Sequence, residues 1–270
     1  MGTVNVSEIY VEQKEIESHF LARKVKVDFY LPANVEKPEE MSLLLINDGQ
    51  DMEVMGFKDI FKEFCSGQHK NRPIFCAAIH CGAERKQEYG VAGVPDFAGR
   101  GSKASAYSRF ILEELLPFIS KTYFVHSFKE KVFAGFSLGG LSSLDIVWKN
   151  PETFSKAGVF SGSLWWRSVD QTEKNYDDDQ HRIMHQEIRN GNYNAGQKFF
   201  FQCGNMDETA DRNNNGIIDS IEDTLDMIDE LVAKGYSREI DIQYIEYADG
   251  KHDVETWGRA MPGFLKWAFV

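Results

Sequence analysis

The hydrophobic and polar positions of this chain follow two patterns that alternate along most of its length. Short runs that are apolar at every position, such as residues 43–46, are typical of parallel strands that are buried on both faces. Between these runs, apolar residues recur every three or four positions, as in residues 57–64, which predicts amphipathic helices. Strands that alternate with helices predict an α/β fold with a doubly wound, mostly parallel sheet and helices on both faces.

The pattern places the elements in a regular order. Two strands with alternating polarity, at residues 7–17 and 22–31, are expected to pair as antiparallel edge strands. Buried strands are predicted at residues 43–46, 73–80, 132–134, 157–160, 198–203 and 240–247, and helices at residues 57–64, 105–123, 224–234 and 255–269. A further helix is predicted between Ser137 and Pro151. We expect one domain over residues 1–270, with a polar, lid-like insert at about residues 161–194.

Length and charge limit the classes of function. A chain of 270 residues suits one α/β domain. Its net charge of −12 argues against a nucleic acid or an anionic membrane as the partner. The four cysteines form no C-x-x-C pair, which is typical of free thiols in a reducing compartment. We find neither a membrane-spanning apolar run nor a signal pattern, so we expect a cytoplasmic protein, or a periplasmic or secreted one if a leader has been removed.

The sequence G-F-S-L-G at residues 135–139 is the first candidate for chemistry. A predicted strand precedes it and a predicted helix follows it, which is the setting of a nucleophile elbow. A serine at such a turn lies in a strained conformation with its hydroxyl exposed, and side chains two residues before and after it would collide, so both positions need glycine. The pattern therefore predicts Ser137 as a nucleophile. The alternative is a glycine-rich turn that carries an ordinary serine.

A serine hydroxyl needs a base to act as a nucleophile, and the base needs an orienting carboxylate. In folds with this elbow the order along the chain is serine, acid, histidine. Only His252 follows the last predicted strand, so we predict that it is the base. The acid is expected just after the preceding strand, where Asp207 follows a tight turn. Glu208 and Asp211 lie in the same acidic loop and are the alternatives.

Ester chemistry also needs backbone amides that stabilise an oxyanion. The Leu138 amide lies at the positive end of the helix that follows the elbow. The Gln50 amide, in the turn after an early buried strand, is predicted as the second donor, and a plain tight turn is the alternative. Arg85 and Glu88 are expected either to pair and brace the loop near the elbow or to face solvent.

The acidic loop carries a second motif. Residues 211–222 match D-x-[DN]-x-[DN]-G-x5-E, the calcium-binding loop of an EF-hand, at every specified position. The predicted ligands are the side chains of Asp211, Asn213, Asn215, Asp219 and Glu222 and the carbonyl of Ile217. Bound Ca²⁺ is expected to be structural and to hold the loop that carries Asp207. The alternative is a polar loop that caps the following helix without a metal.

Two adjacent tryptophans open the polar insert directly after a predicted strand. This position predicts that Trp165 and Trp166 line an aromatic or acyl pocket. Packing on the surface of the insert is the alternative.

With these residues the chain resembles the esterase family of α/β-hydrolases that includes esterase D and the enterochelin esterases. The resemblance extends over nearly the whole chain. It is carried by Val25-Lys26-Val27, Leu31-Pro32, residues 45–50, Glu84-Arg85, Glu88-Tyr89, residues 113–119, 135–140 and 161–166, His252-Asp253, Trp257 and Leu265-Lys266-Trp267. The family implies hydrolysis of a carboxylic ester through an acyl-enzyme. The acidic loop departs from the family, because it is longer and carries the calcium motif.

We therefore predict a serine carboxylesterase that acts on a small-molecule ester and needs no cofactor for its chemistry. Acyl transfer to an alcohol on the same fold is one alternative, and a non-catalytic, calcium-dependent binding protein is another. The sequence leaves open which ester is bound (siderophore, feruloyl, sugar acetyl or simple acyl) and how many subunits the protein has.

Overall fold

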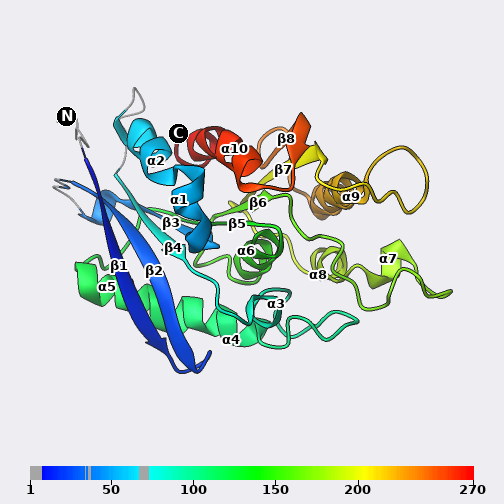
Figure 1. Cartoon of the computed structure of the whole chain (residues 1–270), viewed down its shortest axis with the longest axis horizontal. Coiled ribbons are helices and arrows are strands. Elements are labelled where there is room, and N and C mark those ends of the chain that lie inside the picture. Colours follow the sequence, from blue (N-terminus) through cyan, green and yellow to red (C-terminus); the bar gives the residue numbers. More distant parts are fainter. Residues whose placement is uncertain (1–7, 34, 36–37, 67–72) are drawn as a thin grey trace.

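The computed structural model describes residues 8–33, 35, 38–66 and 73–270. Within them, eight strands form one sheet in the order β1-β2-β4-β3-β5-β6-β7-β8 (Figure 1). The strands are β1 (Ile9–Ser18), β2 (Arg23–Pro32), β3 (Ser42–Asn47), β4 (Ile74–Ile79), β5 (Lys131–Phe136), β6 (Lys156–Phe160), β7 (Lys198–Met206) and β8 (Ile242–Lys251). β1 pairs antiparallel with β2, and β2 pairs antiparallel with β4. The other pairs are parallel, which confirms the predicted fold. Residue 7, the expected start of the first strand, lies outside the described residues.

Helices fill the connections between the strands. They are α1 (Met52–Met55), α2 (Phe57–Ser66), α3 (Arg85–Glu88), α4 (Ala104–Arg109), α5 (Leu116–Tyr123), α6 (Leu138–Lys149), α7 (Asp178–His181), α8 (Ile183–Asn190), α9 (Asp219–Lys234) and α10 (Val254–Phe269), with 3-10 turns η1 (Pro38–Glu40) and η2 (Gly49–Asp51) and a π-helical segment η3 (Phe110–Leu115). Helix α9 begins before the start at residue 224 that its apolar period predicts, at Asp219, where the motif of residues 211–222 would place a helix that holds Glu222. Acids favour a helix N-terminus, but they are not part of the apolar period that marks a helix in a sequence.

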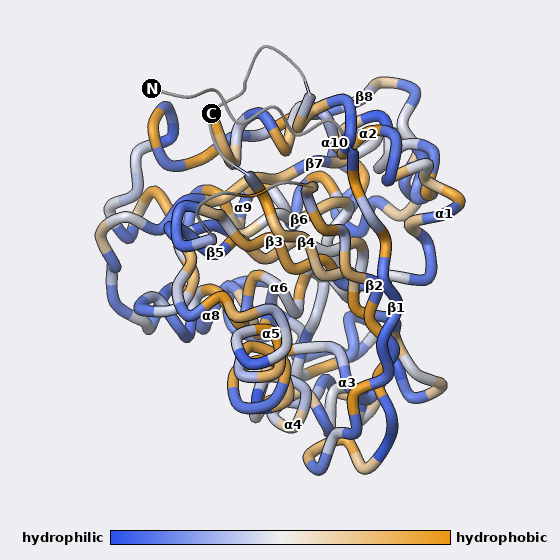
Figure 2. Tube along the Cα trace, turned by 90° about the vertical axis from the view of Figure 1, so that its left-hand side faces the viewer, coloured by the Kyte–Doolittle hydropathy of each residue, from blue (hydrophilic) through white to orange (hydrophobic). Residues whose placement is uncertain are grey.

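The sheet separates two hydrophobic clusters. Successive residues of a strand point to opposite faces, so Leu43 and Leu45 of β3 belong to one cluster and Leu44 and Ile46 to the other. Helices α4, α5, α6, α8 and α9 contribute to the first cluster, and α1, α2 and α10 to the second (Figure 1). Figure 2 shows the same arrangement by hydropathy, with apolar strands inside and polar connections outside. None of the described helices is both long and apolar enough to cross a membrane.

The topology brings several loops to one edge of the sheet. Because β3, β4, β5, β6, β7 and β8 are parallel, the loops that follow them meet at their carboxyl ends. That edge is where open α/β sheets bind their ligands. The predicted nucleophile, acid, base and oxyanion turn all follow strands of this set.

Candidate active site

The turn at Ser137 has the steric form that the glycine pattern predicts. Ser137 joins β5 to α6 with φ 54° and ψ −122°, a strained conformation for a residue with a side chain. A Cβ atom added to Gly135 would lie 2.2 Å from the Gly139 carbonyl oxygen, and one added to Gly139 would lie 2.6 Å from Asp48 Oδ2. Both glycines are therefore needed for the turn to form.

The hydroxyl of Ser137 lies next to the loop that follows β6. Its Oγ atom is 3.3 Å from Ser163 Oγ. The Ser163 amide donates a hydrogen bond of 3.1 Å to the Ser137 carbonyl, and the Ser137 amide donates one of 2.9 Å to the Phe160 carbonyl. Ser163 is buried, and the sequence pattern alone did not single it out. Its signal was its position just past a buried strand that neighbours the strand of the serine.

Asp207 and His252 come from the ends of two neighbouring strands. They directly follow β7 and β8, which pair in parallel. A Cβ atom added to Gly204 would lie 2.4 Å from the Gly250 carbonyl carbon, so the two strand ends approach closely. As a result, Asp207 and His252 line one cavity of about 210 Å³. Its other lining residues are Ser161, Gly162, Ser163, Trp165, Glu208 and Ser220.

The surroundings of His252 favour its neutral form. Burial lowers the pKa of His252, and the charge of Arg85 also lowers it, whereas Asp207 and Asp253 act in the opposite direction. The net shift is downward, so the imidazole is neutral at pH 7, the state in which it can accept a proton. Trp257 packs edge-on against this ring, with 5.3 Å between the ring centroids.

Asp207 has a buried carboxylate oxygen that can accept a further hydrogen bond. Its Oδ2 atom accepts from the Gly204 amide at 3.1 Å, whereas Oδ1 is buried and has no hydrogen-bond partner among the described residues. Burial raises the pKa of Asp207, and the Gly204 amide, the Ser161 hydroxyl and the charge of His252 oppose that shift. Leaving a buried acceptor unpaired costs about 1–3 kcal/mol, so this oxygen favours a nearby donor such as an imidazole N–H.

The two rival acids have other contacts. Glu208 lines the same cavity, but burial raises its pKa and its hydrogen-bond partner is the Ser220 backbone. Asp211 accepts hydrogen bonds from the amides of Asn215 and Gly216, at 3.1 and 2.9 Å. The charge of Asp207, and not that of either rival, is among those that act on His252.

An arginine connects the predicted oxyanion turn to the strand of the serine. Asp48, at φ 61°, leads into η2, which contains Gln50. Arg85 donates from Nε to Asp48 Oδ1 at 2.7 Å and from Nη2 to Asp48 Oδ2 at 2.8 Å. Nη2 also lies 3.4 Å from the carbonyl of Phe136, the residue before the serine. Leu138 is the first residue of α6, and amides in the first turn of a helix have no acceptor inside it.

Arg85 and Glu88 neither pair with each other nor simply face solvent, so both alternatives for them are wrong. Glu88 is fully buried and pairs instead with Arg23, whose Nε and Nη2 lie 2.7 and 2.6 Å from its carboxylate oxygens. Both residues lie on the short helix α3, but each contacts a different strand end. No local pattern revealed these ion pairs, because the partners lie far apart in the sequence, from Arg23 to Glu88 and from Asp48 to Arg85.

The two tryptophans occupy different environments. Trp165 lines the cavity with Asp207 and His252 and also a neighbouring cavity of about 300 Å³. The guanidinium of Arg100 lies 4.8 Å from the centroid of the Trp165 ring. Trp166 is fully buried, and a Cβ atom at Gly90 or Gly101 would lie 2.7 Å from its ring. Trp165 can therefore reach a ligand, whereas Trp166 packs inside the fold.

The loop of residues 211–222 brings several of the predicted calcium ligands together. The side-chain amides of Asn213 and Asn215 both donate to Glu222 Oε1, at 2.7 and 2.6 Å. Arg212 lies 3.2 Å from Asp219 Oδ1 and 3.2 Å from Glu222 Oε2. The part of the chain that the structure describes contains no group of three or more His, Cys, Asp or Glu side chains arranged to hold a metal ion. Two asparagines and a backbone carbonyl would have to complete such a site. The oxygen set therefore fits Ca²⁺ only if the side-chain amides of Asn213 and Asn215 rotate to present their oxygens and Arg212 moves away from Glu222.

The sheet order and the strained serine between a strand and a helix are those of an α/β-hydrolase. The chain matches the family model described as "Putative esterase" over residues 18–268, and it belongs to that family. The family assignment classes the chain as a hydrolase that acts on esters.

Solved structures with the same fold include several esterases. The enterochelin esterase of Shigella flexneri has 19% identity and a TM-score of 0.67, and the match covers 95% of this chain and 57% of that one. This chain thus spans somewhat more than half of that enzyme. The siderophore hydrolase EstA of Aspergillus nidulans has 16% identity and a TM-score of 0.73, with 96% and 93% of the two chains covered. A ferulic acid esterase has 18% identity and a TM-score of 0.68, with 97% and 98% covered.

Proposed function

We propose that this protein is a serine carboxylesterase that hydrolyses a small-molecule ester through an acyl-enzyme. Ser137 is the nucleophile, His252 the general base and Asp207 the acid that orients the base. The observation that carries this proposal is the strained backbone of Ser137 at the turn between β5 and α6. Such strain persists only where the surrounding structure maintains it, and in this class of fold it presents a nucleophile.

The chemistry follows from the order of proton transfers. Neutral His252 takes the proton of the Ser137 hydroxyl while Oγ attacks the ester carbonyl carbon. The imidazolium then gives this proton to the departing alcohol, and an acyl-enzyme remains. Water that loses a proton to His252 attacks the acyl carbon, and the carboxylic acid leaves as Ser137 regains its proton. Asp207, with its free Oδ1 atom, stabilises the imidazolium in both steps.

We assign the stabilisation of the negative charge that develops on the carbonyl oxygen to two backbone amides, those of Gln50 and Leu138. The Leu138 amide is one of the free amides at the start of α6. The Gln50 turn keeps its position relative to the serine through the Arg85–Asp48 ion pair and the contact of Arg85 with the Phe136 carbonyl. Trp165 forms the wall on which the ester lies.

The proposal is tested with Ser137→Ala and a panel of p-nitrophenyl esters. We expect kcat to fall by about 1,000-fold or more, because the nucleophile is lost while the oxyanion donors remain. Ser105→Ala, an exposed serine on α4, is the matched control and should keep its activity. Full activity in Ser137→Ala, with an unchanged melting temperature, would reject the mechanism.

We also propose that the loop of residues 211–222 binds Ca²⁺ with a structural role. The convergence of Asn213, Asn215 and Glu222 supports this, and the ion would replace Arg212 as the partner of Glu222. The test is calorimetric titration of the whole chain with Ca²⁺. Binding that is weakened at least about tenfold in Glu222→Gln is expected, since this residue supplies the bidentate ligand. If wild type releases no heat and its melting temperature does not change with Ca²⁺, Arg212 alone neutralises the loop.

A further inference from the structure

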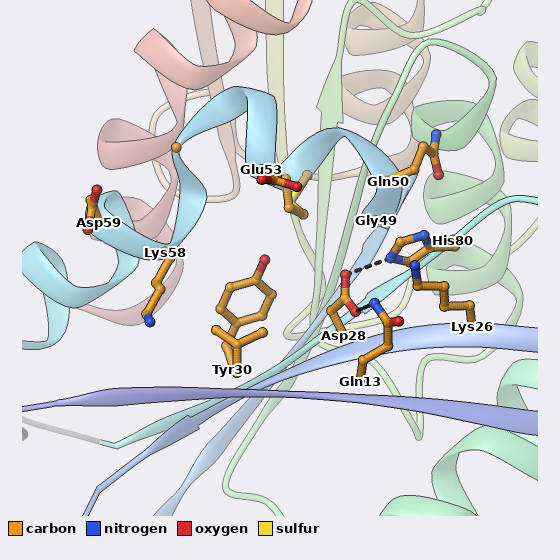
Figure 3. A pocket seen from close by; sticks show the side chains of 13 residues that line it. Gln13, Lys26, Asp28, Tyr30, Gly49, Gln50, Glu53, Lys58, Asp59 and His80 are labelled. Carbon is orange, nitrogen blue, oxygen red and sulfur yellow. Dashed lines mark hydrogen bonds and ion pairs between the residues drawn. The ribbon is translucent and has the colours of Figure 1, made fainter.

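A second cavity, of about 580 Å³, lies on the far side of the oxyanion turn from Ser137. Its walls come from β1, β2, the turn of Gly49 and Gln50, α1, α2 and His80 (Figure 3). In the sheet, β3 lies between β4 and β5. The turn after β3 therefore separates His80, just past β4, from Ser137, just past β5. The cavity is of a size that takes small-molecule ligands, and Gly49, Gln50 and His80 in its wall lie at the carboxyl edge of the sheet, where such folds bind ligands.

A half-buried polar pair forms one end of this cavity. His80 Nε2 lies 2.6 Å from Asp28 Oδ2, and each side chain is only 14% exposed. Gln13 Nε2 donates to Asp28 Oδ1 at 2.6 Å. A Cβ atom added to Gly49 would lie 2.9 Å from His80 Cδ2, so His80 packs directly against the turn that carries Gln50. A ligand that contacts His80 would thus lie beside the predicted oxyanion turn.

The hydroxyl of Tyr30 is the strongest indication of a ligand. The Tyr30 residue is 5% exposed, and its ring packs edge-on against Phe57 and Phe61, at centroid distances of 5.0 and 6.3 Å. In Figure 3 the hydroxyl points into the cavity, and no described residue forms a hydrogen bond with it. The hydroxyl oxygen is not among the buried side-chain atoms that have no partner, so it is accessible from the cavity and free to donate to a ligand. Burial, with Cys76, Asp28 and Glu53 nearby, raises the pKa of Tyr30, so the phenol keeps its proton and can donate it in a hydrogen bond.

The remaining polar groups indicate which class of ligand fits. Lys26, Glu53, Lys58 and Asp59 line the cavity, and none of the four forms an ion pair or a side-chain hydrogen bond within the described ranges. With Asp28, these residues surround the space with positively charged hydrogen-bond donors and negatively charged acceptors. An anion would meet three carboxylates and a cation two ammonium groups, whereas a hydroxyl can donate to the acids and accept from the lysines and the phenol.

We propose that this cavity binds an uncharged, hydroxyl-rich group, of the kind presented by one sugar unit, as part of the ester substrate. The Tyr30 hydroxyl donates to the group, and Asp28 and Glu53 accept from it. Its role in catalysis rests on the proposed function, because only an esterase would place this unit beside the oxyanion turn during a reaction. Binding of a free sugar does not depend on that function.

The first test measures binding of methyl α-D-glucopyranoside to the whole chain by ligand-observed NMR. We expect millimolar binding to wild type and to Ser137→Ala. Tyr30→Phe removes only the hydroxyl and keeps the ring packing, so the dissociation constant should rise about two- to tenfold, as expected for one hydrogen bond. Tyr10→Phe is the matched control, because Tyr10 lies on β1 and is 57% exposed, outside the cavity. Asp28→Asn should weaken binding, and Tyr10→Phe should leave it unchanged.

The second test compares kcat/KM for a methyl glucoside acetate and for p-nitrophenyl acetate. Tyr30→Phe should lower kcat/KM for the sugar ester about two- to tenfold and leave that for the simple ester unchanged. Absence of sugar binding to wild type, or equal binding to wild type, Tyr30→Phe and Asp28→Asn, would overturn the proposal. If sugar binds and Tyr30→Phe weakens it, but neither ester is hydrolysed, the binding site stands and the proposed esterase function fails.

Discussion

The turn at Ser137 and the loop of residues 207–222 are both at the carboxyl edge of the sheet, but different forces hold them. Close packing fixes the turn, because a Cβ atom at Gly135 would meet the backbone of Gly139 and one at Gly139 would meet the side chains of Asp48 and Asn47. Side-chain charges hold the loop, where Arg212 is within 3.2 Å of Asp219, Glu222 and Asp223. The backbone of Ser137 therefore depends mainly on close packing, whereas the loop that follows Asp207 depends mainly on charges that salt, pH or an ion can change.

The largest expected effect comes from replacing a glycine by alanine in each of the two regions and comparing the losses of stability. Gly135→Ala would place a methyl group 2.2 Å from a backbone oxygen, and we expect a loss of stability of about 3 kcal/mol or more. Gly216→Ala, in the loop, meets nothing within 4 Å and adds only the strain of φ +87°, so about 1–2 kcal/mol is expected. Thermal unfolding measures both. Equal losses would mean that sterics do not distinguish the two regions.

A smaller effect, on kcat, is expected at Arg85, whose charge supports the turns next to Ser137. Arg85→Lys keeps the positive charge near Asp48 but loses the two parallel hydrogen bonds. We expect kcat to fall about 10- to 100-fold with little change in KM, because the oxyanion turn moves while the ester-binding wall stays. Arg189→Lys is the control, because the ion pair of Arg189 with Glu230 joins α8 to α9 away from the carboxyl edge of the sheet. A change in KM alone would place Arg85 in ester binding rather than in positioning.

The smallest predicted effect is a shift in the pH profile. The pKa of His252 lies below its ordinary value of 6.5, with burial as the main cause. The protonated imidazole cannot act as a base, so kcat/KM should be constant near pH 7 and fall only as the pH drops through this lowered pKa. Asp207→Asn removes a charge that raises the pKa of His252, so the acid limb should move to still lower pH while the rate also falls. An acid limb centred above pH 6.5 in wild type would contradict the assignment.

Much of the fold could be predicted because its signals are local. The buried runs of β3 and β7 and the glycines of the turn each show their role within a few residues. The short helices α1 and α3 were missed, since one turn is too short to show a helical period. Trp165 and Trp166 have the same sequence signal, yet one lines a cavity and the other fills the space beside Gly90 and Gly101. Local pattern does not distinguish them, because burial depends on partners far along the chain.

The amino-acid order alone specified the strand–serine–helix turn, the succession of strands and helices, and the acid and histidine that follow the last strands. These features depend on backbone sterics and on hydrophobic period, which act between near neighbours. Folding in three dimensions was needed to pair Arg85 with Asp48, to bury Glu88 against Arg23, and to close the Tyr30 cavity with residues from β1, β2, α1 and α2. Such contacts join segments that the chain keeps apart, and only the packing of the sheet and its helices brings them within hydrogen-bonding distance.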